Sequence, residues 1–284
     1  MSTLLKYAGN KQNLMSQINP VLGDWDGVNR YVEPFAGALG SALHAEVPSG
    51  IKVLLSDANL EIIEFYQAVR ENPEEVEHLA NSLPVGEDGY YLVRSWDRDP
   101  LWREKFSLYE RAARTIYLNR NCFNGLYRIN NKGFFTTPWN RNENLKKISI
   151  TSNDSFLELL NRAQISHASW KEVVKGTGDG DVVYCDPPYV DLKNPEKDFG
   201  GYIGSFGLSV QRELRDELVQ ANNRGARVVI SNSWCKETCQ LYGEWQVKEI
   251  FATRRLARNP SARGKTSEIL AWLEPPSYLA RSNQ

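Results

Sequence analysis

Short apolar runs alternate along this chain with stretches of helical periodicity. Strand-like runs occupy residues 31–32, 51–57, 181–186 and 227–231. The apolar spacing between and after them predicts helices over residues 38–45, 60–71, 209–223 and 234–242. Two last runs, at residues 245–251 and 268–273, have the pattern of antiparallel strands. Such alternation around strands rich in valine and isoleucine is typical of an α/β protein with a doubly wound sheet.

Residues 73–168 interrupt this rhythm. They are rich in arginine and aromatic side chains, with helical spacing near residues 74–82 and 101–118. We therefore expect one domain formed by residues 1–72 and 169–284, with residues 73–168 inserted into it as a mainly helical second domain.

The inserted segment also carries a predicted β-hairpin. Residues 127–138 alternate between aromatic and polar side chains around Asn130-Asn-Lys-Gly133, where a tight turn is expected.

Charge is segregated along the chain, although the formal net charge is only −1. Residues 55–93 carry a net charge of −8, residues 94–147 carry +7 and residues 252–270 carry +4. A cationic face built from the two basic segments would attract phosphates. The alternative is a set of ordinary solvated helix faces.

Composition argues against several other classes of protein. Residues 1–7 contain no apolar run of signal-peptide length, and no stretch approaches the roughly 20 apolar residues that span a bilayer. Cys122, Cys185, Cys235 and Cys239 have neither the spacing of a disulfide framework nor that of a zinc site. We therefore expect a cytoplasmic protein with reduced thiols, no membrane partner and no metal.

A glycine-containing turn follows the first predicted strand, in Glu33-Pro-Phe-Ala-Gly-Ala-Leu-Gly40. Glycines at that place let backbone N–H groups approach a nucleotide closely, although the same turn can serve packing alone. Asp57 ends the next strand, where a carboxylate would accept hydrogen bonds from ribose hydroxyls. The alternative role for Asp57 is that of N-cap to the following helix.

The strongest motif is Asp186-Pro-Pro-Tyr189, directly after an apolar run. Two prolines continue neither a strand nor a helix, so the backbone leaves the sheet in a rigid shape. An exocyclic amine placed there could donate one N–H to the Asp186 carboxylate and the other to the Pro187 carbonyl. Its nitrogen could then attack a methyl group on a sulfonium, helped by positioning and electrostatics, while Tyr189 stacks on a flipped base. The alternative is a tight turn.

These motifs together resemble those of the Dam-type (D12 class) DNA adenine-N6 methyltransferases. The family order of motifs is matched by Lys6-Tyr-Ala-Gly-Asn-Lys11, Pro34-Phe35-x-Gly37, a recognition insertion and Asp186-Pro-Pro-Tyr189. The insertion resembles the family's N-R-x-x-x-N-G-L-x-R-x-N-x-x-G-x-F-N-V-P over residues 119–138. Later family spacings are matched by Gly201, Tyr202, Phe206, Gln211 and Ser231-Asn232, so the resemblance covers nearly the whole chain.

Five positions depart from the family pattern. Tyr7 replaces tryptophan and Asn10 replaces the second glycine of the N-terminal motif. In the predicted hairpin, Thr136-Thr137 replaces the common Asn-Val, and Trp139 follows Pro138.

The resemblance implies a Rossmann-like methyltransferase sheet with a DNA target-recognition insertion, S-adenosylmethionine as cofactor and double-stranded DNA as partner. The implied target is N6 of a flipped adenine in GATC or in a longer site containing GAT. The catalytic positions that it implies are Asp186, Pro187, Pro188 and Tyr189. The cofactor-binding positions are Tyr7, Lys11, Phe35, Gly37, Asp57 and Asp186. The DNA-binding positions are Lys6, Phe123, Asn124, Leu126, Arg128 and Pro138.

Several alternatives stay open at this point. Arg128 is expected to read a guanine but could contact a phosphate, and Phe123 is expected to enter the duplex but could be hairpin core. The substrate could be RNA adenine or the N4 amine of DNA cytosine. Other classes are an inactive sequence-specific DNA-binding protein and a small-molecule enzyme of Rossmann type. We expect a monomer encoded by a bacterium or a phage.

Overall fold

The computed structural model describes residues 2–7, 9–130, 132–143, 146–189, 206–253 and 265–276. The motif positions Gly201 and Tyr202 lie outside the described residues, as does most of the basic segment 252–270.

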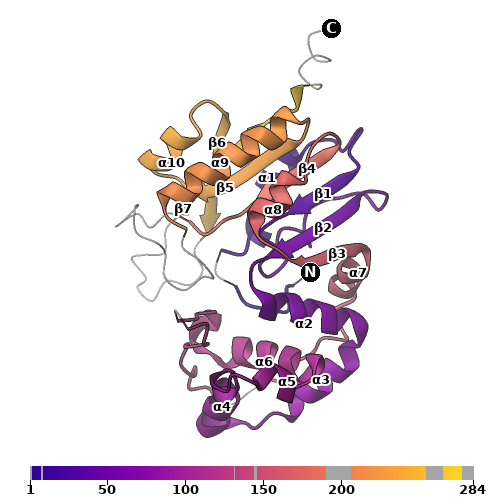
Figure 1. Ribbon diagram of the computed structural model, residues 1–284, viewed down its shortest axis with the longest axis vertical. Helices are drawn as coiled ribbons and strands as arrows, with labels where there is room; N and C mark the ends of the chain where they lie inside the picture. Colours follow the sequence, from indigo (N-terminus) through magenta and orange to yellow (C-terminus); the bar gives the residue numbers. More distant parts are fainter. Residues whose placement is uncertain are drawn as a thin grey trace.

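A sheet of seven strands, in the order β3-β2-β1-β4-β5-β7-β6, forms the centre of the molecule (Figure 1). Its strands are β1 (Arg30–Glu33), β2 (Lys52–Asp57), β3 (Ala163–His167), β4 (Asp181–Cys185), β5 (Arg227–Ser233), β6 (Gln246–Thr253) and β7 (Lys265–Leu273). The first five run parallel, and β7 is antiparallel to both of its neighbours. The chain winds outward in both directions from β1 and β4, and a crevice forms at the carboxyl ends of such a pair.

Helices cover both faces of this sheet. The α-helices are α1 (Met15–Leu22), α2 (Leu60–Glu71), α3 (Pro73–Ser82), α4 (Gly86–Arg94), α5 (Trp102–Lys105), α6 (Leu108–Asn121), α7 (Asp154–Arg162), α8 (Trp170–Lys175), α9 (Leu208–Asn223) and α10 (Lys236–Leu241). The 3-10 helices are η1 (Gln12–Leu14), η2 (Ser95–Arg98) and η3 (Phe123–Gly125).

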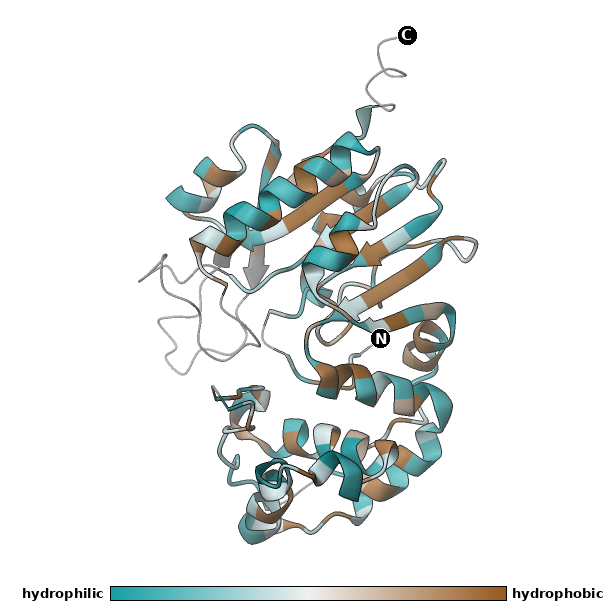
Figure 2. Cartoon of the chain, in the orientation of Figure 1, coloured by the Kyte–Doolittle hydropathy of each residue, from teal (hydrophilic) through white to brown (hydrophobic). Residues whose placement is uncertain are grey.

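Strand β4 shows how the two layers of core arise, because all of its side chains are buried and successive ones point to opposite faces. Val182 and Tyr184 join a core with α1, α2 and α7, whereas Val183 and Cys185 join a core with α8 and α9. Figure 2 shows the apolar central strands and the mixed surfaces of the covering helices. The predicted α/β doubly wound fold is confirmed.

Helices α3 to α6 lie together at one end of the molecule, beside α2 (Figure 1). They share the core on the side of the sheet that α1, α2 and α7 cover. Ala112 and Ile116 of α6 pack there in the same apolar cluster as Ile62 and Phe65 of α2. A smaller cluster around Tyr90 lies under the hairpin region.

The structure differs from the sequence prediction at the end of this segment. Residues 163–167, expected in the insertion, form β3 and pair with β2 at the edge of the sheet. Only Ala163 and Ile165 of β3 are buried, because an edge strand alternates between core and solvent. It therefore lacks the continuous apolar run that marked the central strands.

Residues 38–45 were expected to be helical and form turns instead. Gly37 and Leu39 adopt positive φ angles of 47° and 62°, which an α-helix does not accept. The predicted helix at residues 101–118 is split into α5 and α6, because Ser107 caps α6 through a capping box with Glu110.

Two further local predictions are corrected. The predicted hairpin is held by an isolated antiparallel bridge between Ile129 and Phe135, without a regular two-stranded ladder among the described residues. Helix α9 begins at Leu208, one residue before the predicted start, with Gly207 at its N-cap position. Within the described ranges, no helix is both long enough and apolar enough to cross a membrane.

Candidate active site

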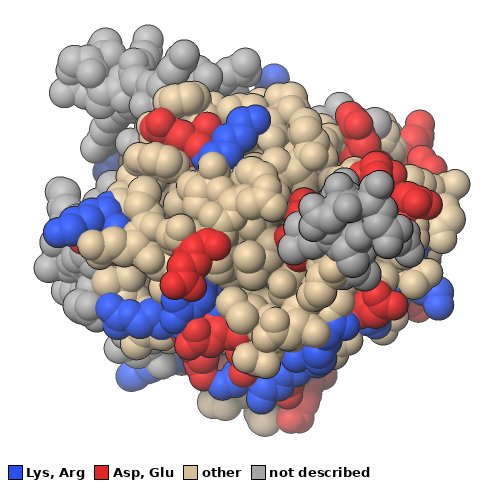
Figure 3. All heavy atoms as spheres, turned by 90° about the horizontal axis from the view of Figure 1, so that it is seen from above, with Lys and Arg blue, Asp and Glu red and all other residues tan. Residues whose placement is uncertain are grey.

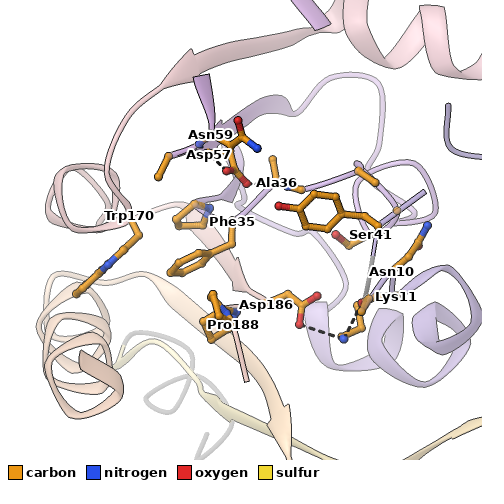
Figure 4. Close-up of a pocket in the computed structure, with 18 of the residues that line it drawn as sticks. Asn10, Lys11, Phe35, Ala36, Ser41, Asp57, Asn59, Trp170, Asp186 and Pro188 are labelled. Atoms are coloured by element: carbon orange, nitrogen blue, oxygen red, sulfur yellow. Dashed lines mark hydrogen bonds and ion pairs between the residues drawn. The ribbon is translucent and has the colours of Figure 1, made fainter. Parts of the chain in front are cut away.

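A cavity of about 590 Å³ opens at the carboxyl ends of β1, β2 and β4. Asp57 and Asn59 lie at one end of it and Asp186 with Lys11 at the other (Figure 4). The fold brings together here every residue predicted to bind cofactor or to take part in catalysis: Tyr7, Lys11, Phe35, Gly37, Asp57, Asp186, Pro187, Pro188 and Tyr189.

Asp57 holds the glycine turn against the end of β2. Its Oδ2 accepts the Gly37 N–H at 2.9 Å and its Oδ1 accepts the Asn59 N–H at 2.9 Å. The N-cap of α2 is Asn59, whose side chain accepts the Glu61 N–H, so Asp57 is not the helix cap. A carboxylate can accept about four hydrogen bonds, and Asp57 therefore retains capacity for ligand hydroxyls. Burial raises the pKa of Asp57 above its ordinary value.

The N-terminal segment packs directly on this turn. A Cβ atom on Gly40 would come within 1.9 Å of the Asn10 Oδ1, so this arrangement of the Asn10 side chain depends on glycine at residue 40. Asn10, which departs from the family pattern, also accepts the Gln12 N–H and donates to Thr3. The amide thus fills the space over the turn and orders its own segment.

Aromatic rings form one wall of the cavity. Phe35 stacks on Trp170 with ring centroids 6.4 Å apart, and it meets Phe206 edge-on at 5.5 Å. Such a wall suits a flat apolar group such as a nucleobase. Trp170 was not identified from the sequence, although Ser169 and Glu172 form a capping box that would have placed α8.

Asp186 lies half-buried at the carboxyl end of β4. The Lys11 ammonium is 3.1 Å from its Oδ1, and the Ser231 hydroxyl donates to the same atom at 2.9 Å. Because both contacts use Oδ1, an incoming N–H can use Oδ2. Burial raises the pKa of Asp186, although the Lys11 ammonium opposes the rise.

The later motif residues support the two prolines. The Gln211 side chain donates to the Pro188 carbonyl at 2.8 Å, and Asn232 donates to Gln211 at 3.0 Å. Gln211 and Asn232 are 0% exposed, so this support is protected from water. The motif's backbone is therefore held from α9 and β5.

The six predicted DNA-binding residues come from two distant parts of the chain: Lys6 lies near the N-terminus, and the other five lie within residues 123–138. The Lys6 N–H donates to the Asn119 side chain, which donates back to the Lys6 carbonyl, both at 2.7 Å. A Cβ atom on Gly125 would come within 2.6 Å of the Lys6 side chain, so the N-terminal segment packs on the loop of residues 123–138, here called the recognition loop after its predicted role.

The recognition loop presents several side chains to solvent. Phe123, Asn124, Arg128 and Pro138 are exposed, and Leu126 is partly exposed. The Phe123 N–H donates to the Pro138 carbonyl at 2.8 Å and closes the base of the loop.

The apolar core under the recognition loop contains Phe135 and Trp139, at 1% and 8% exposure. Phe123 is 37% exposed, which does not fit the alternative of hairpin core for that residue.

Tyr127 connects the recognition loop with the cavity. It lines the cavity, and its hydroxyl is 3.5 Å from the Asn59 Oδ1. Its ring meets Phe135 edge-on, with centroids 5.4 Å apart. The family pattern leaves this position open, so no sequence signal identified it.

Charge and metal-ligand chemistry add two observations. The face viewed from above in Figure 3, away from the end that carries α3 to α6, intermingles basic and acidic side chains. In the part of the chain that the structure describes, no group of three histidine, cysteine or carboxylate side chains is placed to hold a metal ion.

Comparison with known proteins agrees with the motifs. A family model described as D12 class N6 adenine-specific DNA methyltransferase matches residues 7–256. The chain is 37% identical over 270 residues to the Type II methyltransferase M1.LlaDCHI of Lactococcus lactis subsp. cremoris, with 93% of each chain covered. It is 32% identical over 275 residues to a DNA adenine methylase of Vibrio cholerae, with 95% of each covered. It is 30% identical over 277 residues to the DNA N-6-adenine-methyltransferase of Escherichia phage P1, covering 95% of this chain and 35% of that longer protein.

Proposed function

Because the chain belongs to the D12 class of N6 adenine-specific DNA methyltransferases, we propose that it methylates N6 of an adenine flipped out of duplex DNA, with S-adenosylmethionine as the donor. The observation that carries this proposal is a single cavity that extends from Asp57 to Lys11 and the Asp186-Pro-Pro-Tyr189 motif. We call the second end the Asp186 corner. A site for donor and acceptor must place both within one enclosed space.

The residues of the cavity fit S-adenosylmethionine. A volume of about 590 Å³ lies within the range of roughly 300–1,000 Å³ found for small-molecule sites. Asp57 can accept hydrogen bonds from ribose hydroxyls, and the ring wall around Phe35 can hold an adenine. When bound, the cofactor supplies an electrophilic methyl group on a sulfonium sulfur.

The Asp186 corner would then orient the target amine. Asp186 Oδ2 accepts one N–H and the Pro187 carbonyl accepts the other, which turns the N6 lone pair toward the methyl group. The amine is neutral, so no strong base has to remove a proton before attack. Tyr189 stacks on the flipped base, while Lys11 and Ser231 hold the Asp186 carboxylate in place.

Recognition is assigned to the segment between α2 and α7 together with Lys6 of the N-terminal segment. Arg128 would bond bidentately to guanine O6 and N7, Lys6 would reach a second guanine, and Pro138 would meet a base edge. Phe123 and Asn124 would occupy the space beside the flipped adenine. The proposed target is GATC or a longer site containing GAT, and the protein acts as a monomer on DNA in the cytoplasm.

The test is methyl transfer from labelled S-adenosylmethionine to a plasmid, followed by single-molecule sequencing of the product. We expect N6-methyladenine at one short motif. A stem-loop RNA and a plasmid treated with Asp186→Asn serve as controls. Methylation of the RNA in preference to the plasmid, or of cytosine, would contradict the proposal. Site-specific binding without any transfer would identify an inactive DNA-binding protein.

A further inference from the structure

Glu268 is a buried carboxylate that none of the motifs includes. It lies on β7, opposite Ser233 of β5 and Ile250 of β6, and only 8% of it is exposed. A carboxylate at such a place needs partners, because burial without them is costly. Its partners are two residues of the Asp186 corner.

The first partner is Tyr189. The Tyr189 hydroxyl donates to Glu268 Oε2 at 2.6 Å, a short distance that is usual for a charge-assisted hydrogen bond. This bond ties the far end of the ring to the sheet, whereas the near end is tied to the motif backbone. The plane of the ring is therefore held from two sides.

The second partner is Lys11. Its ammonium lies 3.5 Å from Glu268 Oε2, 3.1 Å from Asp186 Oδ1 and 4.5 Å from the centre of the Tyr189 ring. Lys11 is thus shared between two carboxylates and rests over the ring. A displacement of Glu268 would therefore shift both the Tyr189 ring and the Lys11 ammonium, the two groups beside Asp186.

The net charge of Lys11, Asp186 and Glu268 also supports a role for Glu268 in this site. When both carboxyl groups are ionised, one ammonium between two carboxylates leaves an excess of one negative charge in a largely buried cluster. Such an excess favours a cationic ligand, and the sulfonium of the proposed donor carries one positive charge. Methyl transfer would break the sulfur–methyl bond, leave a neutral thioether and form the N6–methyl bond, so the positive charge passes to N6 until one N6 proton is lost to solvent; the same carboxylates would face the charge on both atoms.

We propose that Glu268 is a positioning residue of the methyl-transfer site, which fixes the Tyr189 ring and the Lys11 ammonium around Asp186. This inference rests on the proposed function, because it assigns Glu268 to the same site.

The test is a double-mutant cycle with Glu268→Ala and Tyr189→Phe, measured on a duplex that carries the mapped target site. Tyr189→Phe keeps the ring and removes the hydroxyl, so we expect kcat to fall about tenfold, as for loss of a hydrogen bond to a charged group. In the Glu268→Ala background the same change should alter kcat less than about twofold, because the acceptor is already gone. The KM values for donor and duplex should change less than kcat.

Conservative replacement separates positioning from packing. Glu268→Gln retains an oxygen that accepts the Tyr189 hydroxyl, so it should recover part of the rate lost in Glu268→Ala. Glu244→Gln, on the exposed turn before β6, is the matched control and should leave kcat unchanged. If Glu268→Ala does not fold, Tyr189→Phe should lower kcat less in the Glu268→Gln background than in the wild type, because a hydrogen bond to the introduced amide lacks the carboxylate charge; equal effects in the two backgrounds would overturn the positioning role.

The outcomes distinguish this inference from the proposed function. An active wild type with independent, multiplicative effects of Glu268→Ala and Tyr189→Phe would overturn the positioning role alone. Full activity of Glu268→Ala would do the same. A wild type that transfers no methyl group to duplex DNA would instead overturn the proposed function on which the inference rests.

Discussion

Glu33, at the end of β1, shows how a single buried residue responds to its surroundings. It is 1% exposed and accepts hydrogen bonds from Tyr31 at 2.5 Å and Ser41 at 2.7 Å. Burial raises its pKa to about 8, against the hydrogen bonds from both hydroxyls. The folded protein therefore retains a proton on Glu33 that the unfolded chain loses at a lower pH.

This difference predicts the direction of a pH effect on stability. Between about pH 4.5 and pH 8 the folded state binds more protons at Glu33, so the free energy of unfolding contributed by this group falls as pH rises. Glu33→Gln keeps the neutral shape and should flatten that slope and raise the melting temperature at pH 8. Melting curves from pH 5 to 8 would measure it, with exposed Glu46→Gln as the control. Parallel curves for wild type and Glu33→Gln would contradict the assignment.

Asp186 carries the second prediction at this scale. Asp186→Asn removes the charge that pairs with Lys11, so kcat should fall about 10²–10³-fold with duplex binding retained. Because burial raises the pKa of Asp186, the acid-side decline of the wild-type rate should lie at a higher pH than the titration of an exposed aspartate. Single-turnover rates against pH and a duplex-binding titration check both statements. Substantial turnover by Asp186→Asn would exclude the proposed amine contact.

At the scale of elements, the recognition loop is held mainly by side-chain hydrogen bonds near its two ends, since its strand pairing among the described residues is limited to isolated bridges. The Thr137 hydroxyl donates to the Leu126 carbonyl at 2.6 Å, and the Tyr90 hydroxyl of α4 donates to the Thr137 carbonyl at 2.8 Å. The helices beneath therefore hold the loop that presents Arg128 to solvent. Thr137 departs from the family pattern, and its buried hydroxyl gives it a structural role.

Arg128→Ala tests whether this loop reads a base. A lost bidentate contact to guanine should cost about 1–3 kcal/mol of binding and relax discrimination at one base pair. Binding titrations on the mapped site and on its single-base variants would show this. Lys132→Ala, at the exposed tip of the loop, is the matched control. An equal loss on all duplexes would instead identify Arg128 as a phosphate contact.

At the scale of the whole molecule, one buried cation joins the helical segment to the sheet domain. Arg114 of α6 is 0% exposed and lies 2.8 Å from Asp97 of η2 and 3.3 Å from Glu61 of α2. Asp97 also accepts the Phe135 N–H at 2.8 Å. The Glu61 N–H donates to the Asn59 Oδ1 at 3.0 Å, and Asn59 lines the cavity, so a continuous polar network runs from the recognition loop to the edge of the active site.

Removal of this cation should destabilise the fold. Arg114→Ala removes the buried cation that Glu61 and Asp97 share, while Asp97 keeps its ion pair with Arg98, and we expect a loss of about 3–5 kcal/mol in the free energy of unfolding. Equilibrium denaturation measures the loss. Lys171→Ala, which breaks an exposed pair with Glu213, should cost less than about 1 kcal/mol. A similar small effect for both variants would show that Arg114 contributes no more than a surface ion pair.

Local sequence determined the elements whose signals are short-range. Central strands such as β4 are apolar on both faces, and a proline pair must leave the sheet, so β4 and Asp186-Pro-Pro-Tyr189 were predicted from a few adjacent residues. The family resemblance in turn assigned the cofactor-binding positions, and these proved to line one cavity.

Tertiary structure alone decided which distant residues complete the site. Strand β3 is an edge strand with weak alternation, and its place in the sheet depends on pairing with β2. Tyr127 lies in the site because the loop packs beside the cavity, and Glu268 lies there because β7 pairs with β5. Neither arrangement can be read from a short stretch of sequence. Periodicity reports which face of an element is buried, whereas contacts between residues far apart in sequence follow from how the elements pack.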